Sequence, residues 1–206
     1  MSEATVSEAT LPSRPALAGL IRPGRYGRAE GTPGVRIGPE AGLALATLSA
    51  RDGHLDALRD AARAAFGAEL LDRPRVAHGS EIAFVWAGPG SWLALRRGDD
   101  LEPVLRGTLG LHASVTDQSD GRTVLRVEGP RARDLLAKGL PIDLHPRAFG
   151  VDDVALTHAA HVGVHVWQRD DAPGFDLAVL SGYARSMLAW ALEAGAEFGV
   201  DLVDEA

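Results

Sequence analysis

No cysteine occurs among the 206 residues of this sequence. A chain without cysteine forms no disulfide, binds no metal through thiolates and has no cysteine nucleophile. The absence also fits a reducing compartment, so we expect the protein to work in the cytoplasm.

Basic charge and long apolar runs are also scarce. The chain has 21 Lys and Arg against 28 Asp and Glu, a formal net charge of -7. Nucleic acids and anionic membranes select basic surfaces, so neither is expected as a partner. No apolar stretch approaches the roughly 20 residues that cross a bilayer. The short apolar run 15–21 has charged flanks and no convincing cleavage pattern, and we interpret it as mature protein.

Nucleotide-binding motifs are missing too. The fingerprint G-x-G-x-x-G occurs nowhere in the chain, so a flavin or nicotinamide bound wholly by this chain is not expected. The turn Gly88-Pro89-Gly90 has no following Lys-Ser or Lys-Thr and lies between two aromatic-flanked strands. It therefore predicts a hairpin and not a phosphate loop.

The segment 117–140 carries the clearest local signals. A polar turn leads into 123–128, where apolar and polar residues alternate, which predicts a half-buried strand with Arg126 on its polar face. A helix is expected over 130–140, because proline suits the first helical position and the leucines recur at helical spacing. Arg133 is expected on the wet side of that helix.

The same order of elements is expected twice, which indicates a weak internal repeat. In the first half, a strand at 35–37 or 43–49 precedes a helix at 54–66, strands at 76–77, 81–86 and 92–95, and a helix at 101–109. In the second half, a strand at 123–128 precedes a helix at 130–140, strands at 154–167 and 175–180, and a helix at 182–198. We predict an α+β fold of two pseudo-repeated strand-helix-strand-strand-helix halves, with mostly antiparallel sheets and helices packed on one side. The expected domains are a flexible N-terminal arm (1–32), a first half (33–113) and a second half (114–206).

Three histidines, His158, His161 and His165, would share one face of a helix and suit zinc there. The alternating valines of 162–166 predict a strand instead. In a single strand His161 and His165 stand roughly 13 Å apart at about 3.3 Å per residue, and His158 points the other way. Ligands of one zinc lie much closer together, so we predict no metal site here. Ordinary strand histidines and a subunit interface stay open as their roles.

Two acidic motifs are interpreted as turns. Asp170 and Asp171 precede Ala-Pro-Gly, which favours a solvated hairpin loop over acid–base chemistry. Asp117 and Ser119 form a D-x-S motif, for which an Asx or Ser turn is favoured over a functional role.

Four segments carry a family resemblance. They are 114–143, the W-x-G-P-x-x-W-L pattern of 86–93, the D-L-H-P motif of 143–146 with Phe149 after it, and 175–190. Together they resemble the gamma subunit of heterotetrameric sarcosine oxidases, and more distantly the folate-binding fold of the glycine-cleavage aminomethyltransferases, whose D-x-S motif is similar. The matches span roughly residues 35–195 in the same order.

The resemblance implies an aminomethyltransferase-like fold and a non-catalytic, structural role in assembly. The aminomethyltransferases have an aspartate after a glycine pair in the later strand, whereas 162–166 here contains no carboxylate. The complex so implied belongs to one-carbon metabolism and oxidises sarcosine to glycine, yielding hydrogen peroxide and formaldehyde or methylene-tetrahydrofolate. FAD, FMN, NAD, tetrahydrofolate and zinc are expected on its alpha, beta and delta subunits. No catalytic, cofactor-binding or metal-binding residue is expected on this chain.

The loop 143–150 is the candidate contact with another subunit. It carries His145, Pro146 and Phe149, and amphipathic side chains on loops are common interface anchors. The alternative is that Phe149 fills the core beneath its own loop.

Two other functions would share the fold. One is a standalone folate-binding one-carbon protein, which needs a pocket lined by a carboxylate or arginines. The other is an assembly or repair factor that acts on another enzyme. Co-purification with flavin-bearing subunits, retention of folate, or neither of these distinguishes the three.

Overall fold

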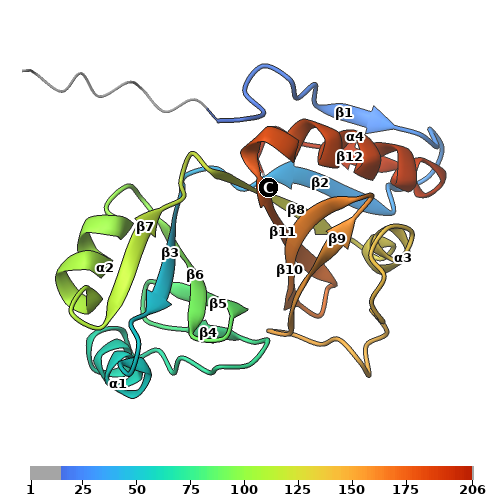
Figure 1. Ribbon diagram of the computed structural model, residues 1–206. Helices are drawn as coiled ribbons and strands as arrows, with labels where there is room; N and C mark the ends of the chain where they lie inside the picture. The colour runs from blue at the N-terminus through green and yellow to red at the C-terminus, as the bar shows by residue number, and fades with distance from the viewer. Residues whose placement is uncertain (1–14, 206) are drawn as a thin grey trace, which may run out of the picture.

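Two β-sheets face each other and helices cover their outer sides in the computed structural model, which describes residues 15–205 (Figure 1). The seven-stranded sheet has the order β1 (Gly24–Tyr26), β12 (Val200–Leu202), β2 (Val35–Pro39), β8 (Arg122–Glu128), β11 (Gly174–Leu180), β10 (Val162–Asp170) and β9 (Val154–Ala159). The five-stranded sheet has the order β4 (Val76–His78), β5 (Ala83–Gly88), β6 (Ser91–Arg97), β3 (Leu43–Ala50) and β7 (Ala113–Asp117). The helices are α1 (Leu55–Phe66), α2 (Leu101–Leu109), α3 (Ala132–Ala137) and α4 (Ala184–Gly195), with 3-10 turns η1 (Ser181–Tyr183) and η2 (Ala196–Phe198).

The order of elements repeats, as the sequence predicts. The chain runs β3-α1-β4-β5-β6-α2-β7 and then β8-α3-β9-β10-β11-α4-β12. The strand order within the sheets repeats as well. The order β4-β5-β6-β3-β7 of the five-stranded sheet corresponds to β9-β10-β11-β8-β12 of the seven-stranded sheet, in which β2 is inserted between β8 and β12. Every pairing is antiparallel except that of β12 with β2. The α+β class is confirmed, although the second unit has three strands between its helices where two were predicted.

The division between the sheets does not follow the predicted domain boundaries. Strand β2 falls in the predicted first half, 33–113, yet it pairs with β8 and β12 in the seven-stranded sheet. The predicted arm, 1–32, lies outside the described residues up to residue 14. In its described part β1 pairs with β12, and Leu17 is buried. This part packs on the seven-stranded sheet.

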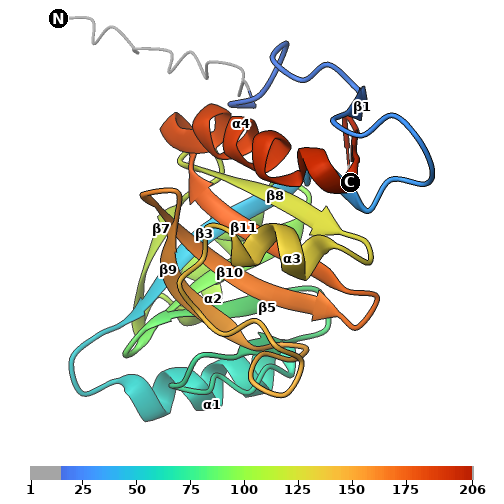
Figure 2. The same ribbon diagram turned by 90° about the vertical axis from the view of Figure 1, so that its right-hand side faces the viewer.

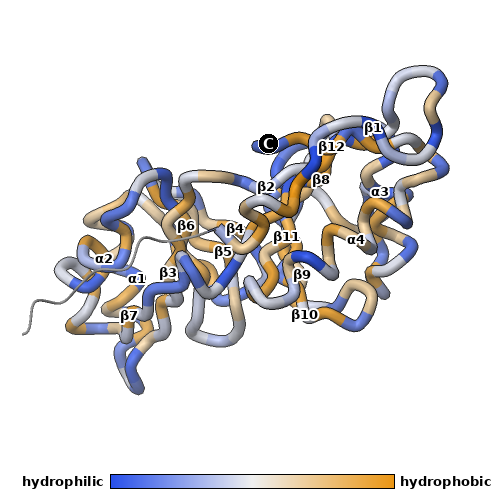
Figure 3. Tube along the Cα trace, turned by 90° about the horizontal axis from the view of Figure 1, so that it is seen from above, coloured by the Kyte–Doolittle hydropathy of each residue, from blue (hydrophilic) through white to orange (hydrophobic). Residues whose placement is uncertain are grey.

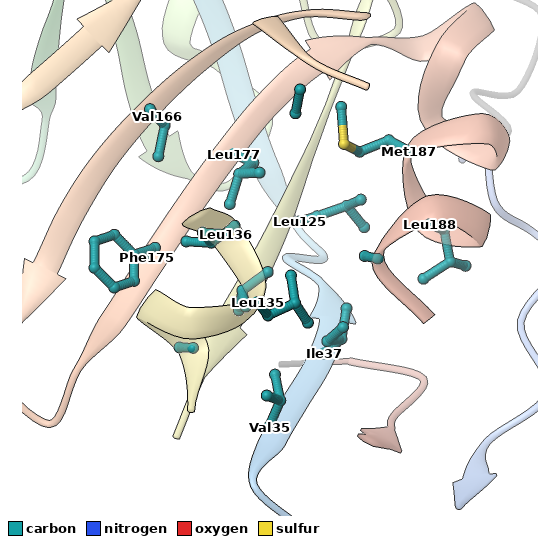
Figure 4. Packing of buried hydrophobic residues seen from close by; sticks show 14 of the residues in the cluster. Val35, Ile37, Leu125, Leu135, Leu136, Val166, Phe175, Leu177, Met187 and Leu188 are labelled. Carbon is teal, nitrogen blue, oxygen red and sulfur yellow. The ribbon is translucent and has the colours of Figure 1, made fainter. Parts of the chain in front are cut away.

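The larger core lies between the outer face of the seven-stranded sheet and helices α3 and α4 (Figures 2 and 4). Helix α4 buries Ala184, Met187, Leu188 and Ala191, a spacing of three and four residues that makes one apolar stripe. Leu135 of α3 joins them against the sheet. Each leucine or methionine so buried contributes about 1.5–3 kcal/mol to the free energy of unfolding.

A second core lies between the five-stranded sheet and helices α1 and α2, at the far end of the molecule from α3 and α4 (Figure 3). Leu101, Leu105 and Leu109 are the buried stripe of α2. Trp92 is fully buried beneath the helices and its indole N–H donates to the carbonyl of Leu71 at 3.2 Å.

The inner faces of the two sheets form a third core. Val124, Trp167 and Ala178 of the seven-stranded sheet pack with Leu45 and Leu93 of the five-stranded sheet. This face of β8 was predicted to be polar and wet, but the second sheet covers it and Arg126 is nearly buried there, its side chain 12% exposed. The prediction failed because strand periodicity distinguishes two faces and does not say whether a second sheet covers the polar one.

The sheets are also joined at one edge, where β4 and β9 begin. The amide of Val76 donates to Asp152 at 2.8 Å, and the amide of Val154 donates to Pro74 at 3.1 Å. Arg75 pairs with Asp153 at 2.5 Å beside them. These contacts hold the beginnings of β4 and β9 against each other.

Helix α3 is shorter than the predicted 130–140. After it, Gly139 packs against Trp190, and a Cβ on Gly139 would lie 2.2 Å from the indole ring. Arg133 is not on a wet side. It donates to the carbonyl of Phe149 at 3.2 Å and to Gln168 at 2.7 Å, and burial lowers its pKa. The arginine thus ties the following loop to the sheet, a tertiary contact that helical periodicity does not report.

The predicted strand 154–167 is a hairpin. It turns at Ala160 and His161, whose φ angles are 46° and 72°. Because of the turn, His158 and His165 lie on the same face of the sheet, where the single-strand prediction had placed them on opposite faces. Positive φ at two non-glycine residues stores local backbone strain.

Replacing Ala160 with Asn and His161 with Gly should therefore stabilise the protein. Asn-Gly is the pair that two-residue turns with two positive φ angles prefer, so we expect a gain of about 1 kcal/mol in the free energy of unfolding. Urea denaturation of the double variant measures it. A variant that unfolds at the same or a lower urea concentration would show that the turn is unstrained.

Candidate functional site

A charged network lies between the two sheets. Arg126 forms ion pairs with Glu40 and, at 3.1 Å, with Asp176, which stands opposite it on β11. The side chains of Glu40 and Asp176 are only 2% and 7% exposed. Arg97 of β6 reaches Glu40 at 2.9 Å from the other sheet. The network therefore connects the two sheets through paired charges.

Burial controls the titration of both carboxyl groups. Desolvation raises the pKa of Glu40, and the positive charge of Arg126 opposes the rise. Desolvation likewise raises the pKa of Asp176, against the charge and hydrogen bond of Arg126. Both carboxylates thus depend on one arginine, which makes Arg126 the centre of the network.

A groove of about 760 Å³ adjoins this network. Apolar residues such as Leu17, Leu45 and Val124 line it, together with Arg122. Its carboxylates are those of Glu40, Asp99, Glu102, Asp117, Asp120 and Asp204. A groove of this volume has the size of a small-molecule site, and the charged residues of its lining are predominantly acidic.

The D-x-S motif is a turn at the groove, as favoured from the sequence. Asp117 Oδ1 accepts from the amide of Ser119 at 3.1 Å and from its hydroxyl at 2.7 Å. Ser119 Oγ in turn accepts from the amide of Leu45 at 3.1 Å. The motif fastens the connection between β7 and β8 to β3.

Two basic side chains on the inner face of the seven-stranded sheet have unpaired polar atoms. His165 is 9% exposed, and its Nδ1 is buried without a hydrogen-bond partner among residues 15–205. In the same described part of the chain, Nε of Arg122 is also buried and unpartnered. Burial, with a smaller contribution from Arg122, lowers the pKa of His165 from 6.5 to about 4. Burial also lowers the pKa of Arg122.

The depressed pKa of His165 predicts a pH dependence of stability. The folded protein holds this imidazole neutral down to about pH 4, whereas the unfolded chain binds a proton near pH 6.5. The contribution of His165 to the free energy of unfolding is therefore fully present above about pH 6.5 and is lost as the pH falls toward about 4. The full contribution is about 3 kcal/mol. Arg122, Arg126 and His158 are further basic groups on this face, and the facing residues of β11 nearest to His165, Ala178 and Leu180, do not titrate.

Urea denaturation of wild type and of His165→Leu at several pH values tests this expectation. The variant should lose less stability than wild type between about pH 7 and pH 5. His158→Leu, which removes an exposed imidazole from the same face, should keep the wild-type slope. Equal slopes for His165→Leu and wild type would contradict the prediction.

The three residues predicted for a subunit interface differ in their burial. Phe149 lies in the larger core, 6% exposed, with its ring 6.4 Å from that of Phe175. This burial is what the alternative interpretation, a core residue beneath its own loop, expects. His145 and Pro146 are exposed, and their contact with another subunit stays a prediction.

The other sequence candidates have local roles. Asp170 Oδ1 accepts from the amide of Ala172 at 3.0 Å, which closes the predicted hairpin loop. His161 lies in the turn of the β9–β10 hairpin. Within residues 15–205 no group of three His, Asp or Glu side chains is placed to bind a metal ion. None of the helices described there is long and apolar enough to span a membrane.

The sequence analysis gave no role to Arg122 or Glu40. A signal for Arg122 was available, because it shares the face of Val124 and Arg126 in the alternating strand β8. Glu40 follows β2 and showed no pattern of its own, since its partners Arg126 and Arg97 are 86 and 57 residues away in the sequence.

Comparison with known proteins places the chain in a family. The model of the sarcosine oxidase, gamma subunit family matches residues 51–197. The chain belongs to this family. Curated sarcosine oxidase gamma subunits from Corynebacterium sp. strain U-96 and strain P-1 are each 35% identical, over 121 and 123 residues. These alignments cover 58% and 59% of this chain and 58% and 60% of the relatives, so the chain spans less than two thirds of the curated relatives that it matches.

Solved structures extend the likeness to most of the fold. The heterotetrameric sarcosine oxidase from Corynebacterium sp. U-96, in complex with pyrrole 2-carboxylate, contains a chain with a TM-score of 0.72 and 31% identity, covering 82% of this chain and 87% of that one. The glycine cleavage system aminomethyltransferase T from Bartonella henselae matches with a TM-score of 0.60 and 12% identity, covering 83% of this chain and 48% of that one. The second likeness shows the fold alone, and it confirms the predicted aminomethyltransferase-like architecture.

Proposed function

We propose that this chain is a structural and assembly subunit of a cytoplasmic heterotetrameric sarcosine oxidase, with alpha, beta and delta subunits as its partners. In this proposal the complex oxidises sarcosine to glycine and yields hydrogen peroxide and formaldehyde or methylene-tetrahydrofolate. FAD, FMN, NAD, tetrahydrofolate and zinc are held by the other subunits. No step of the reaction is assigned to residues of this chain.

The observation that carries the structural role is how the buried charged groups are used. Arg126 pairs with both Glu40 and Asp176, and Arg97 reaches Glu40 from the other sheet. Asp117 and Ser119 bind each other and the backbone of β3. Glu40 and Asp117 also line the groove, but a catalytic acid or base must be free to exchange a proton with a substrate, and these carboxylates are held by an ion pair and by hydrogen bonds. Family membership over residues 51–197 supports the complex to which this structural subunit belongs.

A folate-binding one-carbon protein is the second candidate, and the groove of about 760 Å³ is the observation that favours it. Its acidic lining disfavours the anionic tail of folate, because like charges repel most strongly where water is partly excluded. We therefore rank it below the structural role.

Purification from the native host and of the isolated chain tests the proposal. The chain should co-purify at equal stoichiometry with larger subunits that show flavin absorbance. Alone it should be colourless and contain no stoichiometric zinc. Folate retained by the isolated chain would favour the second candidate, and a chain that purifies alone from its host would favour an assembly factor.

A further inference from the structure

One end of the inner face of the seven-stranded sheet is left open by the five-stranded sheet. On this face Val124 and Ala178 are buried in the core between the sheets. Two residues further along β11, on the same face, Leu180 is 48% exposed and stands opposite Arg122 of β8. Leu156 on the neighbouring hairpin is 43% exposed, opposite His165. We call the surface of Leu156, His165, Leu180 and Arg122 the open end.

The open end combines exposed apolar groups with unsatisfied basic ones. Buried polar groups in native proteins almost always have hydrogen-bond partners, so unpartnered atoms on two neighbouring side chains require an explanation. Nδ1 of His165 and Nε of Arg122 are both buried and unpartnered within residues 15–205, and no ion pair described there involves Arg122. Among the described residues these two atoms have no acceptor and Arg122 has no paired counter-charge, and a carboxylate supplies an acceptor and a negative charge together.

The surface between the two leucines is accessible. Gly163 precedes His165 by two positions on the same face, opposite His158. A Cβ built on Gly163 would meet no atom within 4 Å. An incoming side chain therefore has space next to His165.

We propose that the open end docks an acidic side chain carried on an apolar segment of another subunit. The carboxylate accepts from the guanidinium group of Arg122 and from the imidazole of His165, and the flanking apolar residues cover Leu156 and Leu180. The identity of the partner rests on the proposed function, whereas the carboxylate site depends only on this chain.

Two observations favour a protein segment over a free small carboxylate. A small carboxylate would leave both exposed leucines uncovered, and exposed apolar groups around a polar centre are typical of protein interfaces. The adjoining groove, which Arg122 also lines, carries Asp99, Asp117 and Asp204 and weakens the binding of any anion, whereas a segment that covers the leucines gains apolar contacts that a free anion does not.

Acetate titrated into the isolated chain tests the carboxylate site without any partner. The ring resonances of His165 should respond saturably to acetate and not to chloride at the same ionic strength. Bound carboxylate should also move the protonation of His165 to higher pH. The response should fall at least tenfold in Arg122→Gln and persist in Arg73→Gln, an exposed arginine beside the β4 edge. No response to acetate, or an equal response in Arg122→Gln, would overturn the site.

Co-expression with the other subunits tests the docking. Arg122→Gln should assemble at least tenfold less well than wild type and Arg73→Gln, while the isolated variant keeps the wild-type melting temperature. Leu180→Ser, which changes an exposed side chain, should also weaken assembly and serves if Arg122→Gln folds poorly. Normal assembly of both variants would overturn the docking, and with a positive acetate response it would leave a small carboxylate as the ligand. Failure of the wild-type chain to assemble would instead count against the proposed function.

Discussion

Replacing Arg126 with Met is expected to destabilise the protein by about 3–5 kcal/mol, because removal of one partner leaves buried charges uncompensated. Arg126 is paired with both Glu40 and Asp176, whose side chains are 2% and 7% exposed. Without the arginine, two carboxylates remain in the same water-poor space between the sheets. Arg97 still reaches Glu40 from an exposed position, so Asp176 suffers the greater loss.

The variant should also acquire a distinctive pH dependence. Burial already raises the pKa of Glu40 and Asp176, and removal of Arg126 raises both further. A carboxyl group whose folded pKa is raised stabilises the fold below its unfolded pKa and loses that contribution as the pH rises through the folded value. Arg126→Met should therefore be weakest at neutral pH and recover stability, relative to wild type, on acidification toward about pH 5.

Urea denaturation at about pH 7.5 and pH 5 measures both effects. The matched control is Arg36→Met, because Arg36 and Glu128 pair at 3.0 Å on an exposed part of the same sheet. Exposed ion pairs contribute little, so the control should cost less than about 1 kcal/mol. An Arg126→Met protein that is as stable as the control would show that the network does not hold the sheets together.

The second large effect is expected for Phe149→Ala. The ring is 6% exposed, stacks on Phe175 and belongs to the larger core. Truncation of a buried phenylalanine costs about 3–5 kcal/mol, which corresponds to a fall of about 10 °C in the melting temperature of a chain of this size. Thermal unfolding of the isolated chain measures it.

His145→Ala is the control for Phe149→Ala, since His145 lies in the same loop and is exposed. It should change the free energy of unfolding by no more than about 0.5 kcal/mol. If Phe149→Ala keeps its melting temperature and instead prevents co-purification with other subunits, Phe149 is an interface anchor and its burial here does not describe the assembled state.

Local patterns were sufficient for many, though not all, of the elements of this fold. The leucine stripe of 101–109 and the alternation of 123–128 are patterns of residues that are close together in the sequence. The helix and the strand that they predict are both present, and their ends differ from the prediction by no more than one residue. The repeat was predictable for the same reason, because the order of elements is a property of the chain itself. The family resemblance also lay in such segments.

The tertiary structure alone decided which polar residues matter. Strand periodicity placed Arg126 on the face opposite the core, and only the second sheet turned that face into an interior. Arg122 and His165 lie on one face because of the register of β8, β11 and β10. This register brings together residues that are 43 positions apart in the sequence. For a similar reason Arg133 was assigned to the wet side of its helix and the role of Phe149 stayed open, since the contact between them closes only when the loop folds back onto the sheet. Sequence determined where strands and helices form, because those interactions are local. Burial of charge depends on what packs over each face, and that was settled only by the three-dimensional arrangement.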